Sequence, residues 1–167
     1  MLNDIMLVSD GRSGADFARR LKETERPCAL SIHFLEHGEF KATSGVKYEV
    51  KILKVSDFPQ EEQNLWGVVG KALWKGWDLC PREVAALLEE KVSDEDIKSA
   101  GLIGIHVILK EPYFDCPFGE DVPDASWDLK INPDGEYRLS HAYARFGTHK
   151  SRGLHPDMGV AFIAHQK

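Results

Sequence analysis

The stretch Gly101-Leu-Ile-Gly-Ile-His-Val-Ile-Leu109 is the part of the chain that decides the fold. Its apolar side chains fall on both alternating faces, and His106 is the one polar side chain among them. A strand has this pattern when other elements cover it on both sides, so we expect it near the centre of a sheet. Gly101 and Gly104 leave room for a close neighbour along its first half.

The overall composition indicates one globular domain over residues 1–167. The hydrophobic fraction of 43% and the charged fraction of 29% are those of an ordinary soluble protein. The net charge of −6 argues against a general nucleic-acid binder. Widely spaced Cys28, Cys80 and Cys116 favour reduced thiols and a cytoplasmic location. Residues 1–8 have the features of neither a signal peptide nor a membrane anchor.

The first part of the chain is predicted to contain short strands and one helix. Residues 9–14 are expected to form a turn between a strand and a helix. Ser13 or Asp10 would cap this helix, and Pro27 would end it. Alternation of apolar and polar residues predicts the strands. These expected strands are residues 5–8, 28–35, 40–43 and 46–55, of which the last two form a hairpin across Ser44 and Gly45.

The middle of the chain is predicted to be helical and rich in tryptophan. Near Ser56 the apolar period changes from two to about 3.6, and a Ser/Asp cap with a first-turn proline signals a helix start. Gly67 and Gly70 interrupt this helix, which close packing would explain. Two shorter helices are expected at 82–91 and 93–100. The apolar stripe, which we expect to be buried against one face of the sheet, consists of Leu65, Trp66, Val69, Leu73, Trp74 and Trp77.

The last part of the chain is predicted to complete the sheet. The turn sequence Asn132-Pro-Asp-Gly135 indicates a hairpin with arms 127–131 and 136–145. A closing strand is expected at 159–164. Together these elements predict an α+β fold with a mainly antiparallel sheet of about six strands and the Trp-rich helical segment on one face. The central strand follows a helix directly, which permits one parallel pair.

Residues 111–126 form an acidic, aromatic segment that contains three prolines and no Lys or Arg. A loop of this length inside a domain is uncommon. Aromatic side chains anchor protein interfaces, and the acids would steer a basic partner. The sequence therefore predicts a non-catalytic binding or regulatory domain that recognises a protein partner through this loop. The partner-binding candidates are Tyr113, Phe114, Phe118, Glu120 and Asp121.

A small enzyme or metal-binding protein is the alternative class of function. Its site would lie among His141, His149 and His155, together with a carboxylate such as Asp157. Cys116 beside a late histidine would be a nucleophile, but nothing in the sequence brings the two together. Because no nucleophile–base pair, metal-ligand spacing or cofactor loop is recognisable, the binding domain is favoured and no cofactor is expected.

Two basic stretches are candidates for binding an anion. The turn at residues 9–14 can present backbone N–H groups and a helix dipole to a phosphate, but it lacks the spacing of a phosphate-binding loop. The second stretch is the loop at residues 146–158, with Arg145 just before it. This loop either recruits a partner or neutralises the acidic segment. The anion-binding candidates are Arg12, Ser13, Arg145, Lys150 and Arg152.

Overall fold

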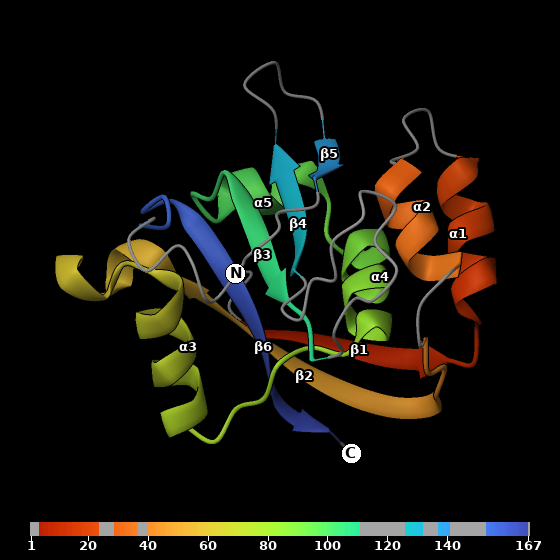
Figure 1. Cartoon of the computed structure of the whole chain (residues 1–167), viewed down its shortest axis with the longest axis horizontal. Coiled ribbons are helices and arrows are strands. Elements are labelled where there is room, and N and C mark those ends of the chain that lie inside the picture. Colours follow the sequence, from red (N-terminus) through yellow and green to blue (C-terminus); the bar gives the residue numbers. More distant parts are fainter. Residues whose placement is uncertain are drawn as a thin grey trace, which may run out of the picture.

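A six-stranded mixed sheet organises the computed structural model, which describes residues 4–23, 29–36, 40–110, 126–131, 137–140 and 153–166 (Figure 1). The strands are β1 (Asp4–Asp10), β2 (Ser44–Lys54), β3 (Gly104–Ile108), β4 (Ser126–Ile131), β5 (Tyr137–Ser140) and β6 (Met158–Gln166). They lie in the order β1-β2-β6-β3-β4-β5. The α+β class is confirmed. The expected antiparallel arrangement is corrected at the centre of the sheet, where β3 and β6 pair in parallel.

Helices cover both faces of this sheet. They are α1 (Gly14–Lys22), α2 (Ala29–Glu36), α3 (Leu65–Trp74), α4 (Arg82–Lys91) and α5 (Asp94–Ser99), with short 3-10 turns η1 (Val55–Asp57) and η2 (Gln60–Glu62). Buried side chains of α1, α2, α4 and α5 form one core with the sheet, and those of α3 form another. Figure 1 accordingly shows α3 standing apart from α1, α2 and α4.

The centre of the sheet is β3, as its sequence predicts. All five of its residues are buried, with β6 on one side and β4 on the other. Ile105 and Val107 belong to the core beneath α4, whereas Ile108 belongs to the core beneath α3. His106 is 6% exposed. The apolar residues on both faces of β3 therefore reflect the packing of helices against both faces of the sheet.

Three helices form where local signals predict them. Ser13 caps α1 through a capping box, in which its side chain accepts from the Asp16 backbone N–H and the Asp16 carboxylate accepts from the Ser13 backbone. Ser93 and Asp96 make the same arrangement at α5. The helix predicted at residues 82–91 is α4. The starts of α1 and α5 depend on capping contacts within one turn, and α4 begins directly after Pro81, so the sequence alone locates all three.

Two strands predicted before residue 44 are wrong. Residues 29–36 form the helix α2, and residues 40–43 are not a strand. Leu35 of α2 is buried in the core, and the Phe40 ring lies 5.7 Å from that of Phe17 on α1. Packing against α1 therefore overrides the alternating pattern. The strand β2 pairs with β1 and β6 rather than with a preceding hairpin arm.

The start of α3 also differs from the prediction. Asn64 caps this helix by accepting a hydrogen bond from the Gly67 backbone N–H at 3.0 Å, whereas Ser56 lies in η1. Close packing explains Gly67, because a Cβ there would lie 2.4 Å from the Glu62 carbonyl oxygen. It does not explain Gly70, where a Cβ would meet no atom within 4 Å.

The side of α3 that faces the sheet is only partly the predicted one: Val69 is buried, and Leu65 and Trp77 are partly buried against the same core. Trp66, Leu73 and Trp74 are 52%, 51% and 81% exposed, so the prediction that they are buried is wrong. Smaller side chains let the helix lie closer to the sheet. The buried residues of α3 are Val68, Val69 and Ala72.

The late strands are confirmed in part. The strands β4 and β5 pair antiparallel from Asp128 with Ser140 to Ile131 with Tyr137, as the predicted hairpin requires. The turn at residues 132–135 and the arm beyond Ser140 lie outside the described residues. The strand predicted at 159–164 is β6, which lies inside the sheet between β2 and β3.

The exposure of Trp74 predicts that Trp74→Ala will lower the free energy of unfolding by less than about 0.5 kcal/mol. Phe162→Ala removes a fully buried ring from the core beneath α3 and should cost about 3–5 kcal/mol. Urea unfolding of both variants measures the difference. A loss above about 1 kcal/mol for Trp74→Ala would contradict an exposed ring.

Candidate functional site

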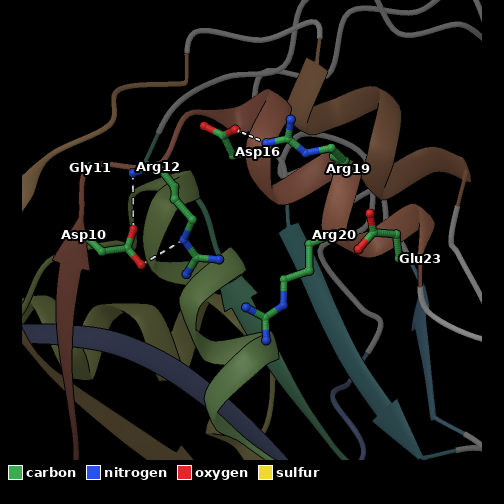
Figure 2. A pocket seen from close by; sticks show the side chains of 7 residues that line it. All are labelled: Asp10, Gly11, Arg12, Asp16, Arg19, Arg20 and Glu23. Atoms are coloured by element: carbon green, nitrogen blue, oxygen red, sulfur yellow. Dashed lines mark hydrogen bonds and ion pairs between the residues drawn. The ribbon is translucent and has the colours of Figure 1, made fainter.

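A surface pocket of about 460 Å³ lies against the turn between β1 and α1 (Figure 2). Gly11 turns the chain there with a φ of +83°, a left-handed conformation that favours glycine. The lining holds three arginines and three carboxylates, so their charges balance. The lining residues are Asp10, Gly11, Arg12, Asp16, Arg19, Arg20 and Glu23.

Two carboxylates hold the guanidinium of Arg12. Its Nε donates to Asp10 Oδ2 at 2.8 Å, and its Nη1 and Nη2 each donate to Glu90 at 2.7 Å. The guanidinium carbon also lies 4.2 Å from the centre of the Phe17 ring. The hydrogen bonds to Glu90 are the largest cause that raises the pKa of Arg12 above its ordinary value. Arg12 thus joins β1 to α4 through charged hydrogen bonds, and it contacts α1 through the Phe17 ring.

An anion at the start of α1 would meet the carboxylate of Asp16. This carboxylate accepts hydrogen bonds from the backbone N–H and Oγ of Ser13 at 2.9 and 2.7 Å, which lower the pKa of Asp16. Arg19 pairs with Asp16, and the Nε of Arg20 lies 3.3 Å from Glu90 Oε1. The chain's own carboxylates therefore compete with any anion for these groups, and anion binding by Arg12 and Ser13 stays a prediction.

Most other predicted site residues lie outside the described part of the chain. His155 and Asp157 are described, and they precede β6. His155 Nδ1 accepts from the Asp157 backbone N–H at 3.2 Å, while the Asp157 carboxylate lies 3.3 Å from Lys54 Nζ. Among the residues described, no three His, Cys, Asp or Glu are grouped to hold a metal ion. The candidates outside these ranges are Tyr113, Phe114, Cys116, Phe118, Glu120, Asp121, His141, Arg145, His149, Lys150 and Arg152.

A smaller pocket of about 190 Å³ lies at the C-terminal ends of the parallel strands β3 and β6. Asp78, Lys110 and His165 contribute its charged and titratable groups. Lys110 Nζ donates to Asp78 Oδ2 at 2.6 Å, and this bond is the main cause that lowers the pKa of Asp78. These residues are far apart in the sequence, so no local motif predicts the pocket. Its described lining has no Ser, Thr or Cys to act as a nucleophile.

The buried carboxylate of Glu83 ties the start of α4 to the segment before β2. It accepts hydrogen bonds from the Thr43 backbone N–H at 2.9 Å, Thr43 Oγ1 at 2.7 Å and the Tyr48 hydroxyl at 3.0 Å. Glu83 is only 2% exposed. Since three donors satisfy its two oxygens, this group has a structural role.

Large apolar side chains gather on the outer side of α3. Exposed apolar residues also occur elsewhere and are normal on a protein surface, as with the pair Met6 and Val8 on β1 and the single Ile103 before β3. The outer side of α3 instead places three such residues on one helix of ten residues, opposite its buried side. Sequence periodicity missed this surface because the helix is apolar on both sides. We define the α3 face as Trp66, Gly70, Leu73 and Trp74.

The α3 face has a basic border. Residues 65–77 contain Lys71 and Lys75 but no Asp or Glu, in a chain whose net charge is −6. Lys71 Nζ lies 5.3 Å from the centre of the Trp74 ring, and Lys75 Nζ lies 4.6 Å from that of Trp77. Both distances suit a cation–π contact. The surface therefore combines exposed aromatic area with positive charge.

No protein-family model, curated protein or solved structure matches this chain. None of the helices in the described ranges has the length and hydropathy that crossing a membrane requires. Function must therefore be inferred from the surfaces and sites of the chain itself.

The contacts of Arg12 predict that Arg12→Ala will lower the free energy of unfolding by about 1–2 kcal/mol, because Asp10 loses this cation and Glu90 keeps only the longer pair with Arg20. Chemical unfolding measures the loss, and calorimetry with inorganic phosphate measures anion binding. Arg20→Ala, which removes a single pair at 3.3 Å, is the milder control. If the wild type binds phosphate and Arg12→Ala does not, the turn binds anions despite its carboxylates.

A second prediction concerns pH. Burial, and then the charge of Glu90, raise the pKa of Glu89 from 4.5 to about 8. The folded chain keeps this proton while the unfolded chain releases it, so stability falls as pH rises from 4.5 to about 8. For the wild type, this fall in the free energy of unfolding should amount to a few kcal/mol, since one pKa unit corresponds to about 1.4 kcal/mol. Glu89→Gln should not show it, because its side chain has no proton to release.

Urea unfolding at both ends of this pH range tests that prediction. Glu95→Gln on α5 is the matched control, because this side chain is exposed. Equal pH dependence for the wild type and Glu89→Gln would show that Glu89 does not retain its proton.

Proposed function

We propose that this protein is a non-catalytic binding domain that associates with a protein partner through the α3 face. The observation that carries the proposal is the exposure of Trp66, Leu73 and Trp74 on a helix whose opposite side is buried. Exposed apolar surface is unfavourable in water, and a partner that covers it removes that cost. Tryptophan is also among the residues that contribute most to binding at protein interfaces.

The acidic segment 111–126 is the second part of the proposal, and it rests on sequence alone. Its aromatic residues Tyr113, Phe114 and Phe118 are suited to anchor a partner, and Glu120 and Asp121 would steer a basic one. This charge is opposite to that of the α3 face, so the two elements would recognise different surfaces. The widely spaced cysteines favour a cytoplasmic location for such a domain.

Affinity capture from extracts of the source cells tests the two elements separately. We expect Trp74→Arg to reduce the recovery of specific partners at least about tenfold, since it places a charge in the apolar contact. Val8→Arg is the matched control, because Val8 is 52% exposed on β1, which runs toward α1 and away from α3 (Figure 1). Phe118→Ala with Asp121→Lys tests the acidic segment.

Circular dichroism first establishes that each variant is folded. Recovery of the same proteins, in the same amounts, by the wild type and Trp74→Arg would refute binding through the α3 face. If only Phe118→Ala with Asp121→Lys lost them, the acidic segment would be the recognition element.

A further inference from the structure

We propose that the partner on the α3 face is a second copy of this chain, and that the α3 helices of two copies cross antiparallel at Gly70. This inference rests on the proposed function and names its partner. It follows from the spacing of the apolar residues around Gly70, the open space at Gly70 and the distribution of charge along α3.

The α3 face is arranged symmetrically about Gly70. Trp66 precedes it by four residues and Trp74 follows it by four, so the two rings lie about one helical turn on either side. In a twofold symmetric pair, each surface contacts its own counterpart. A twofold axis at Gly70 would therefore bring Trp66 of one copy against Trp74 of the other, and would do so twice.

Among the residues that the structure describes, no close contact accounts for Gly70 in the helix. Glycine in a helix interior is less favourable than alanine, yet a Cβ at Gly70 would meet no atom within 4 Å. Gly67, by comparison, is required by its contact with Glu62. The missing side chain leaves a shallow gap between the two tryptophans. A second helix can cross closely there, because helix packing depends on large side chains filling gaps on the facing helix.

The charges along this segment favour a second copy over other partners. Glu61 and Glu62 precede α3, whereas Lys71 and Lys75 lie toward its C-terminal end. An antiparallel crossing would place the basic end of each helix near the acidic end of the other, which is electrostatically favourable. A uniformly anionic partner, such as a lipid surface, would attract the lysines but repel both glutamates and a chain of net charge −6.

The size of the contact predicts a weak dimer. One helix face per copy buries less than the roughly 800 Å² per partner of a standard interface. We therefore expect a dissociation constant in the micromolar range, which corresponds to reversible association at moderate concentration.

Sedimentation velocity over a concentration series tests the dimer. Trp74→Arg should raise the dissociation constant at least about tenfold. Gly70→Ala and Gly70→Leu should also weaken the dimer, the larger side chain more, because each fills the crossing point. Both should raise the thermal midpoint of unfolding by about 2–4 °C at low chain concentration, since they replace glycine at an open helix position.

This opposite effect on dimer and monomer separates a crossing point from a purely structural glycine. Val8→Arg should dimerise as the wild type does. A chain that stays monomeric at concentrations up to about 1 mM would overturn the inference. So would a dimer whose dissociation constant is unchanged in Trp74→Arg and Gly70→Leu. If the chain is monomeric while Trp74→Arg still loses a captured protein, the proposed function stands and only the identity of the partner is wrong.

Discussion

The parallel pairing of β3 with β6 is the contact on which the rest of the structure depends. It extends from Gly104 opposite Met158 to Val107 opposite Ala161. The strand β6 contributes to both cores, with Phe162 beneath α3 and Ala161 beneath α4. The chain must also come very close at Gly159, where a Cβ would lie 2.6 Å from Ile52 Cγ2. Both helical layers therefore rest on the placement of a single C-terminal strand.

Much of the fold is predictable wherever the determining contacts are local. Capping boxes at Ser13 and Ser93 locate two helix starts, and the doubly apolar run of β3 indicates its central position. The helix α2 is different, because a short apolar run suits either a strand or a helix. Its helical form accompanies a close contact with the start of α1, where a Cβ at Gly14 would lie 2.2 Å from the Leu35 carbonyl oxygen. No pattern within residues 29–36 reveals that contact.

The candidate surfaces were harder to predict than the fold. Periodicity finds α3, but it cannot say which of two apolar sides is buried, and the compact side of Val68 and Ala72 packs against the sheet. The strongest partner of Arg12 is Glu90, 78 residues later in the sequence. In the sequence, a basic residue in a strand–helix turn is a candidate for binding a phosphate, but the fold pairs Arg12 with a carboxylate. Long-range partners of this kind are the information that a single sequence lacks.

The position of β6 between β2 and β3 also bears on how the chain is made. During synthesis, β2 and β3 are complete well before residues 158–166 appear, so the edges that β6 will join remain open in the growing chain. Open strand edges can pair with other molecules, and pairing between distant segments is slow to form. A nascent chain halted before Met158 would therefore hold two separate groups of strands, β1 with β2 and β3 with β4 and β5, and would be prone to aggregate at both exposed edges.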